Sequence, residues 1–370
     1  MGRFRRGAWW GWMLAAIACG SPSSPGPDAW EDAVPDGTVR ETGGDPGNRD
    51  PGGRDLGQGA GGDPGNPGDA LDMPEGGTDS EGTWEPPPPG PLDDRLRLDH
   101  LQWEGTHNSY HVATPGGLPQ WDYTHAPLEV QLERQGVRQV ELDVHWDPDL
   151  QAFTVFHIPY ADPGTTCGTL RECLLAIRGW SDAHPSHAPI FVLVEPKDDV
   201  DDVPITGHLP DLDREVLEVF PSPRILRPDD VRGGWVSIQA ALRIRGWPTL
   251  RQARGRVAFV LLDEGAHRQA YLKLHPRLQG AVFFARGGAG ESWGAVMEHG
   301  NPLRDEAAIR RDVAAGYLVR SGPETREEVE AALTLGVHLI STDRPDAVFG
   351  APFAMGIPGG RPMGCNPVTA

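Results

Sequence analysis

Beyond residue 95 the chain alternates short apolar runs with amphipathic stretches. Several apolar runs lack polar alternation, which is typical of strands covered on both faces in a parallel sheet. The predicted strands are 99–104, 138–146, 153–158, 189–196, 256–262, 280–286, 316–321 and 337–342. The predicted helices between them are 127–136, 169–179, 211–219, 248–254, 265–274, 305–315 and 324–335.

This order of elements predicts an α/β fold with one folded domain. Eight strands with interleaved helices indicate a TIM-type (β/α)8 barrel over residues 96–350, with one irregular passage allowed between the second and third strands. Residues 351–370 are then a C-terminal tail. A doubly wound open sheet is the alternative architecture.

The N-terminus has the pattern of an export signal. A basic start at residues 1–6 is followed by an apolar run at 7–18 and then by Cys19. The run is shorter than the about 20 residues that a helix needs to cross a bilayer. "LAAIAC" resembles a bacterial lipobox, so residues 1–19 are predicted to be a lipoprotein signal peptide with lipid attached at Cys19. An ordinary cleaved signal or a buried N-terminal helix is the alternative.

Residues 20–95 are rich in Gly, Pro and Asp and have few aliphatic side chains. Such a segment cannot bury enough apolar surface to fold, so we expect a disordered spacer. Residues 20–86 carry 15 acidic and 3 basic side chains, which account for most of the net charge of −20. The acidity argues against a nucleic-acid partner. We expect a monomeric domain, exported and tethered to the bacterial cell envelope or the cell surface.

Three further cysteines fall in the predicted domain and tail, Cys167, Cys173 and Cys365. In an exported protein, Cys167 and Cys173 could pair with each other, or one of them could pair with Cys365. Either pairing leaves one thiol over. The spacing does not suggest a zinc site.

Polar side chains fall at or after the ends of the predicted strands, where TIM barrels carry their chemistry, with Glu141 and Asp143 inside the second strand. These residues are His107, Glu141, Asp143, His157, Glu195, Lys197, Arg320 and Asp343.

Glu141 and Asp143 are two residues apart on one strand, so their side chains point to the same face. Two carboxylates in a barrel interior repel each other unless a cation lies between them. Adding Glu195 and the side-chain oxygen of Asn108 gives an all-oxygen set, which suits Ca²⁺, and less well Mg²⁺. The simpler interpretation is a salt bridge from Glu141 or Asp143 to Arg138 or Lys197.

His107 and His157 come from different strands and could flank a substrate. Two histidines acting as base and acid suit transfer at a phosphodiester, with a metal balancing the phosphate charge. Taken alone, a histidine in "VFHI" is more often a core residue.

Together these segments resemble the bacterial calcium-dependent phosphatidylinositol-specific phospholipase C family. The resemblance covers residues 98–348 and implies cleavage of a membrane phospholipid. Attack by the inositol 2-hydroxyl would give a cyclic inositol phosphate and diacylglycerol. The segments are "GTHNSYH", "QGVRQVELDVHWD", "VFHIPYAD", "FVLVEPKDD", "WPTLRQARGRVAFVL", "GYLVRS" and "LISTDRP".

The resemblance also implies roles for individual residues. His107 would stabilise the pentavalent phosphate, and His157 would protonate the leaving group. The implied Ca²⁺ ligands are Asn108, Glu141, Asp143 and Glu195, with Glu141 or Glu195 also the candidate base.

The resemblance is weaker for the residues that would contact the phosphate and the headgroup. Lys197 would contact phosphate, and Arg320 is retained. "VRSGPETREEVE" departs from the family pattern after Arg320, which puts the headgroup in doubt. Simple salt bridges are the alternative for Lys197, Arg320 and Asp343.

Other functions remain open. A glycerophosphodiester phosphodiesterase shares the barrel, but usually has His-Arg-Gly where this chain has His107-Asn108-Ser109. A sphingomyelinase-type lyase and a non-catalytic headgroup-binding module are further alternatives.

Two smaller expectations concern the motif and the tryptophans. In "GTHNSYH", Gly105 would allow close backbone approach, and His111 has no required role. Four tryptophans could contact a membrane interface, although core packing is commoner. They are Trp103, Trp121, Trp146 and Trp293.

Overall fold

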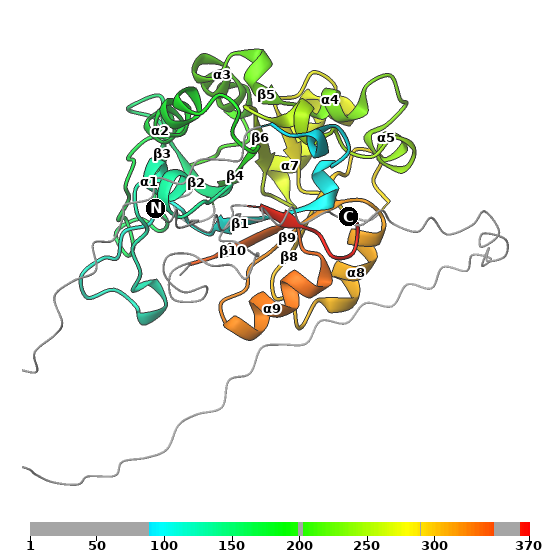
Figure 1. Ribbon diagram of the computed structural model, residues 1–370. Coiled ribbons are helices and arrows are strands. Elements are labelled where there is room, and N and C mark those ends of the chain that lie inside the picture. Colours follow the sequence, from blue (N-terminus) through cyan, green and yellow to red (C-terminus); the bar gives the residue numbers. More distant parts are fainter. Residues whose placement is uncertain (1–88, 199–202, 289, 344–362) are drawn as a thin grey trace, which may run out of the picture. The chain divides into compact units, whose positions relative to one another are not determined.

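Eight parallel strands form the wall of a barrel (Figure 1). The structure is a computed structural model that describes residues 89–198, 203–288, 290–343 and 363–370. The wall runs in the order of the chain and closes at one bridge between Arg286 and Val296. Its strands are β1 (Leu101–Thr106), β2 (Gln139–Asp147), β4 (Ile190–Pro196), β6 (Val257–Leu261), β7 (Phe283–Ala285), β8 (Val296–His299), β9 (Leu318–Ser321) and β10 (Leu339–Thr342).

This wall confirms the predicted TIM-type barrel, because a doubly wound sheet would stay open at two edges. Burial explains why the strands are continuous apolar runs. All residues of β1, β6, β9 and β10 are buried, since each strand faces the barrel interior on one side and covering elements on the other.

The prediction that the third strand belongs to the barrel wall is wrong. β3 (Ala152–Val155) pairs antiparallel with β2 and is not part of the wall. The connection between the two strands is too short for the crossover that parallel strands need, so only a hairpin can form. The irregular passage allowed at this point is therefore a hairpin.

The wall strand that replaces it, β8, was not predicted. Its sequence "VMEH" combines two buried apolar residues with two polar ones, so it lacks the apolar run of the other strands. Two shorter strands add to the sheet, β5 (Ile225–Leu226) beside β6 and β11 (Met363–Cys365) antiparallel to β1.

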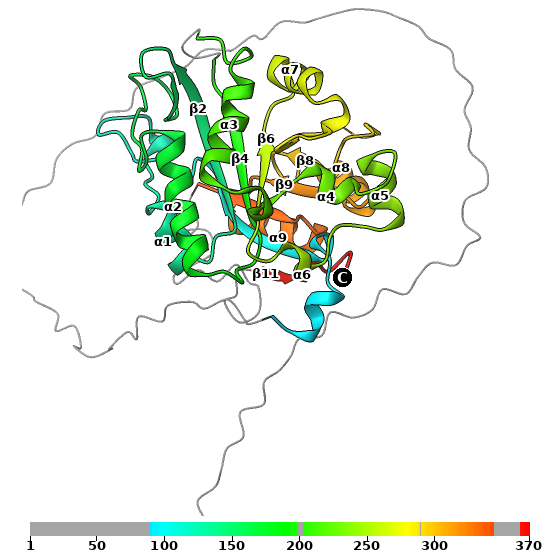
Figure 2. The same cartoon turned by 90° about the horizontal axis from the view of Figure 1, so that it is seen from above.

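Helices cover the outside of the barrel, as Figure 2 shows for α2, α3, α7 and α8. Threonine side chains cap the N-termini of α2, α6 and α9 by accepting a backbone N–H bond. The short helices α4 and α5 were not predicted. The helices are α1 (Leu128–Arg134), α2 (Leu170–Ala183), α3 (Leu209–Val219), α4 (Pro228–Arg232), α5 (Ile238–Ile244), α6 (Leu250–Ala253), α7 (Ala266–Leu274), α8 (Glu306–Ala314) and α9 (Arg326–Leu335).

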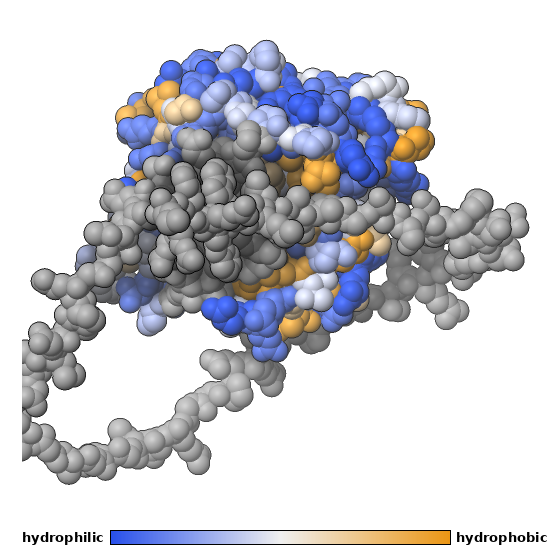
Figure 3. Space-filling view, in the orientation of Figure 1, coloured by the Kyte–Doolittle hydropathy of each residue, from blue (hydrophilic) through white to orange (hydrophobic). Residues whose placement is uncertain are grey.

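The surface of the domain is mostly hydrophilic on the face in Figure 3, with apolar residues in separate small groups. Within the described ranges, no helix is both long and apolar enough to span a membrane. Trp103 and Trp146 are buried, and Trp293 packs against the core. For these three tryptophans the structure shows core packing.

One disulfide joins Cys167 to Cys173, with the two Cα atoms 5.3 Å apart. Cys365 is disulfide-bonded as well, so none of the cysteines in the described part of the chain is free. The expectation of one leftover thiol is therefore wrong. Cys19 and residues 20–88 lie outside the described residues.

Both predicted boundaries of the domain shift. Residues Pro91–Asp94 already form a 3-10 helix, in which Asp93 pairs with the buried Arg254 at 2.5 Å. At the other end, β11 belongs to the sheet although it lies in the predicted tail. Its neighbour Asn366 is fully buried.

Asn366 fastens the C-terminal segment to the barrel. Its backbone N–H donates to the carbonyl of His100 at 2.9 Å, and its side-chain amide donates to the carbonyl of Gly336 at 2.7 Å. Its side-chain oxygen accepts from Val368 N–H at 2.9 Å.

We predict that Asn366→Ala lowers the free energy of unfolding by about 1–3 kcal/mol, because the buried carbonyl of Gly336 loses its donor. Urea unfolding monitored by circular dichroism measures the change. Val368→Ala, at a half-exposed position of the same segment, should shift stability by less than about 0.5 kcal/mol. Equal effects of the two substitutions would contradict this role of Asn366.

Candidate active site

The carboxyl ends of the barrel strands carry the polar residues that the sequence singled out. His107 follows β1, while Glu141 and Asp143 lie on β2. Glu195 lies near the end of β4, Lys197 follows it, and Arg320 lies on β9. Parallel strands end at one rim, so these side chains converge there.

The turn after β1 is fastened to β2 by hydrogen bonds. The backbone N–H of Ser109 donates to the carbonyl of Glu141 at 3.0 Å, and the Ser109 hydroxyl accepts from the Glu141 N–H at 2.8 Å. Asn108 has a positive φ of 43°, a conformation that Asn tolerates better than most residues. Gly105 faces Gln139, whose Cβ would lie 2.9 Å from an added Cβ, so the close approach there is to a side chain.

Three carboxylates form a cluster on β2 and β4. Asp143 and Glu195 are register partners, and ligand atoms of Glu141, Asp143 and Glu195 all lie within 4.8 Å of one another. Asp143 is fully buried, and among the described residues neither of its oxygens accepts a hydrogen bond, its contact with Lys197 being an ion pair at 3.5 Å. Burial, opposed by Lys197 but reinforced by Glu195 and Glu141, raises the pKa of Asp143 to about 8.

Two basic side chains partly balance this charge. Lys197 Nζ lies 2.9 Å from Glu195 Oε1 and 3.5 Å from Asp143 Oδ2. Arg320 Nη2 lies 2.7 Å from Glu141 Oε2, and its Nη1 lies 2.6 Å from Glu298 Oε1. Lys197 and Arg320 thus form the salt bridges considered as their alternative role.

Arg138, the other proposed partner of the cluster, donates hydrogen bonds to two backbone carbonyls. Its Nη1 donates to the carbonyls of Leu132 and Val137 at 2.9 and 2.7 Å.

The cluster fits a calcium ion. Carboxylate oxygens are the ligands that Ca²⁺ prefers, and a buried carboxylate without hydrogen bonds is unfavourable unless a cation compensates it. Asn108 lies next to this cluster through Tyr110, whose hydroxyl donates to Asn108 Oδ1 at 3.3 Å. Burial, and after it the charge of Asp143, raise the pKa of Tyr110.

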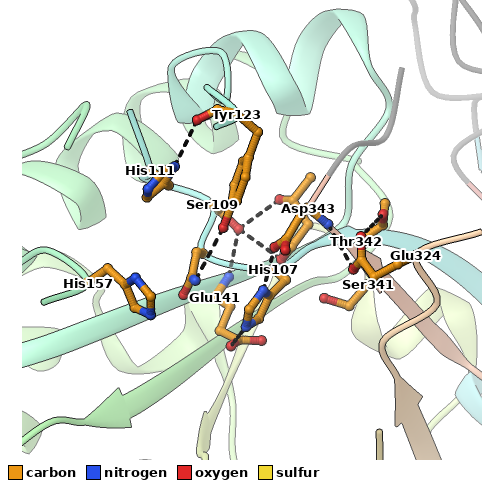
Figure 4. A network of polar contacts seen from close by, with 12 residues as sticks. His107, Ser109, His111, Tyr123, Glu141, His157, Glu324, Ser341, Thr342 and Asp343 are labelled. Atoms are coloured by element: carbon orange, nitrogen blue, oxygen red, sulfur yellow. Dashed lines mark hydrogen bonds and ion pairs between the residues drawn. The ribbon is translucent and has the colours of Figure 1, made fainter. Parts of the chain in front are cut away.

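His107 bridges two carboxylates, as Figure 4 shows. Its Nδ1 lies 2.5 Å from Asp343 Oδ1, and its Nε2 lies 3.4 Å from Glu141 Oε1. Burial would lower the pKa of His107, but the charge of Glu141 and the hydrogen bond to Asp343 outweigh it and raise the pKa to about 9. The two carboxylates thus favour the protonated form of His107, which has 35% of its side chain exposed.

His157 lies in the loop after β3, to one side of His107 and Glu141 (Figure 4). Its Nδ1 lies 2.9 Å from Asp162 Oδ2, and the ring of Trp121 meets it edge-on at 5.2 Å. Burial lowers the pKa of His157, Asp162 opposes that shift, and the charges of Lys197 and His107 add to it. The two predicted histidines therefore belong to one site.

Some residues of the site were missed by sequence reasoning. Tyr110 and Asp162 lie inside quoted motifs, "GTHNSYH" and "VFHIPYAD", but nothing in the spacing assigns them a partner. Glu298 lies on the unpredicted strand β8. Asp343, for which a simple salt bridge was the alternative interpretation, pairs with His107.

Comparison with known proteins agrees with this geometry. Residues 96–154 and 148–367 match the family model described as "Phosphoinositide phospholipase C, Ca2+-dependent". A search of curated proteins found no match.

Solved structures share the fold. A calcium-dependent phosphoinositol-specific phospholipase C from a Pseudomonas species is 21% identical, with a TM-score of 0.56, over 75% of this chain and 97% of that one. A Ca²⁺-dependent phosphatidylinositol-specific phospholipase C from Streptomyces antibioticus is 17% identical, with a TM-score of 0.53, over 74% of this chain and 100% of that one.

The family model spans nearly the whole described domain, including all three cluster carboxylates and both histidines. The chain is therefore a phosphodiesterase that belongs to the Ca²⁺-dependent phosphoinositide phospholipase C family.

Proposed function

We propose that this enzyme cleaves phosphatidylinositol-type lipids to a cyclic inositol phosphate and diacylglycerol. The observation that carries the proposal is the placement of two histidines beside a cluster of three carboxylates, of which Glu141 and Asp143 are buried. One histidine is held cationic between carboxylates, and the other has an imidazole nitrogen left for proton transfer. A phosphodiester placed between them would meet a positive charge and an acid.

Residues of the chain would divide the chemistry as follows. Glu141, Asp143 and Glu195, with Asn108 beside them, would hold Ca²⁺, which supplies charge stabilisation to the phosphate and acidifies a hydroxyl group close to it. His107 would donate a hydrogen bond to a phosphate oxygen as negative charge builds up there. Lys197, which lies beside Glu195 and Asp143, would add positive charge next to the phosphate.

The proton balance needs no water. The inositol 2-hydroxyl loses its proton to a carboxylate, and its oxygen forms a bond to phosphorus. The bond from phosphorus to the glycerol oxygen breaks, and His157 gives its proton to that oxygen. The product is a five-membered cyclic phosphate.

Glu195 is the better placed base. Both oxygens of Glu141 are engaged, one by Arg320 and the other by His107. Glu195 pairs with Lys197 through Oε1 and has 32% of its side chain exposed, so its second oxygen can reach a substrate hydroxyl.

Two findings support specificity for an inositol headgroup, the family and the bound ligand of one solved structure. A Pseudomonas relative of this fold was solved as a complex with myo-inositol. The sequence His107-Asn108-Ser109 distinguishes the chain from the glycerophosphodiester phosphodiesterases, which usually have His-Arg-Gly. Arg320 is engaged by Glu141 and Glu298, which leaves other groups to contact the headgroup.

Phosphorus NMR tests the reaction. With phosphatidylinositol vesicles and Ca²⁺, we expect a cyclic inositol phosphate signal, and with chelator we expect none, because the carboxylate cluster then lacks its ion. Cleavage of glycerophosphoinositol but not of the lipid would favour the glycerophosphodiesterase alternative. Binding of vesicles without any product would favour a non-catalytic module.

Variants of the histidines serve as controls for this assay. His107→Ala and His157→Ala should each lower the rate by about 10²–10⁴-fold, the usual contribution of a positioned acid or base. His208→Ala, at a partly exposed histidine that pairs with Asp211, should leave the rate unchanged. Wild-type rates in both site variants would refute the proposed roles.

Stability measurements test the ion site separately from activity. A Ca²⁺ concentration 100 times the Kd should stabilise the wild type by about 2.7 kcal/mol. In Asp143→Asn most of this gain should vanish, because a buried ligand is lost. Thermal unfolding with and without Ca²⁺ measures both. Asp149→Asn, at an exposed position after β2, should keep the full gain, and an unchanged gain in Asp143→Asn would exclude that residue as a ligand.

We propose that the protein is exported to an oxidising compartment, which the disulfide of Cys167 and Cys173 supports. Residues 1–19 predict a lipid anchor at Cys19. The chain has 4 cysteines, and Cys365 is also disulfide-bonded. Lipid on the sulfur of Cys19 would exclude that sulfur from any disulfide.

Mass spectrometry of the mature protein decides the state of Cys19. The lipobox predicts an N-terminal peptide that begins at Cys19 and carries a diacylglyceryl thioether. The same digest, run without reductant, shows whether the peptide with Cys365 is joined to a peptide with Cys19. A joined pair would exclude the anchor and indicate a secreted form.

A further inference from the structure

Asp162 is a buried carboxylate held between two histidines. Its Oδ2 lies 2.7 Å from Nε2 of His111 and 2.9 Å from Nδ1 of His157. Its other oxygen accepts from the Thr114 hydroxyl at 3.3 Å. With 1% of its side chain exposed, Asp162 depends on these groups for the hydrogen bonds that water would otherwise supply.

His111 has an acceptor on each ring nitrogen. Besides Asp162 at Nε2, its Nδ1 lies 2.9 Å from the carbonyl oxygen of Tyr123 (Figure 4). A carbonyl and a carboxylate can only accept, so both nitrogens must donate, and only the imidazolium does that. The ring is fully buried and packs on Tyr123 at 4.3 Å. His111 is thus a fixed positive charge beside Asp162.

The backbone around these side chains is built to hold them in place. Residues 158 and 162 bond to each other across a tight loop, and the loop is joined to the segment after β1 through the pair His111 and Thr165. At Gly164, an added Cβ would lie 2.0 Å from the carbonyl oxygen of Val112, so the two segments touch. The disulfide from Cys167 anchors the end of the loop to α2.

This arrangement fixes which nitrogen of His157 faces the substrate. Because Nδ1 donates to Asp162, Nε2 carries the proton that His157 can transfer. The other groups that act on His157 are His107 and Lys197, both on the side of the carboxylate cluster, with Trp121 against its ring.

A second cation on Asp162 solves an electrostatic problem. When His157 gives up its proton, a buried carboxylate with one partner would be left unpaired, which is strongly unfavourable. The positive charge of His111 stays on the same oxygen and compensates Asp162 in both states of His157.

We propose that His111 and Asp162 are positioning residues that hold His157 as the acid of the reaction. The proposal rests on the proposed function, since it assigns His157 the transfer of a proton from Nε2 to the glycerol oxygen as the phosphorus–oxygen bond breaks. His111, for which no required role was predicted, is part of the site.

Leaving-group dependence tests the proposal. An acid matters when the leaving group is an alkoxide and matters little when it is a nitrophenolate, which leaves without a proton. Asp162→Asn should therefore lower kcat on an inositol phosphodiester of a simple alcohol by about 10²-fold or more, with a much smaller loss on the p-nitrophenyl ester. His111→Gln should show the same pattern, and Asp162→Glu should recover part of the rate.

The matched control is Asp213→Asn. Asp213 is another carboxylate that pairs with a histidine, His275 at 2.9 Å, between α3 and α7. Any loss there should be equal on the two substrates. Equal losses on both substrates in Asp162→Asn would overturn the proposal, because a purely structural role lowers both rates together.

Nitrogen NMR of the imidazoles gives a readout without substrate. In the free wild-type protein we expect both nitrogens of His111 to be protonated, and neutral His157 to carry its proton on Nδ1. Asp162→Asn should abolish the Nδ1 preference of His157. A neutral His111, or an unchanged His157 in the variant, would overturn the proposal even if the wild type cleaved neither substrate.

Discussion

Three carboxylates on two adjacent parallel strands are the feature on which the rest of the site depends. Glu141, Asp143 and Glu195 lie close together, the first two buried, so their repulsion must be balanced by positive charge. Lys197, Arg320 and the imidazole of His107 pair with them from three other positions along the chain. Within the described residues Asp143 still accepts no hydrogen bond, which is the condition that a calcium ion relieves.

Much of the fold could be predicted because a strand that is buried on both faces appears in the sequence as a continuous apolar run. Seven apolar runs correspond to strands of the wall, and their polar ends to the site. The prediction failed where the apolar run is interrupted, or where it fits more than one kind of strand. β3 is as apolar as a wall strand, yet its short connection makes it a hairpin, and β8 ends in Glu298 and His299. Connection length would have identified the hairpin, but nothing local identifies β8.

The candidate site also contains residues that could be predicted and residues that could not. Glu195 was found because the barrel fixes where strand ends go, and Glu141 because it shares one face of β2 with Asp143. The partners of His157 were not, because His111 and Asp162 meet only through the fold of two loops. Hydrogen-bond pairing between loops depends on tertiary structure, and a single sequence carries no pattern for it. Arg320 was found, but its salt bridge to Glu298 could not be foreseen while β8 was missing.

The charged residues of the site are also connected to the place where the barrel closes. The wall closes between β7 and β8 at one bridge, from Arg286 to Val296. Across this seam, Arg286 pairs with Glu298 at 2.9 Å, Glu298 pairs with Arg320, and Arg320 pairs with Glu141. Salt bridges of alternating charge thus run from the bridge that closes the wall to the reaction centre. Substitution of Arg320 or Glu298 to change the headgroup side would therefore also remove ion pairs that lie between the closure and the site.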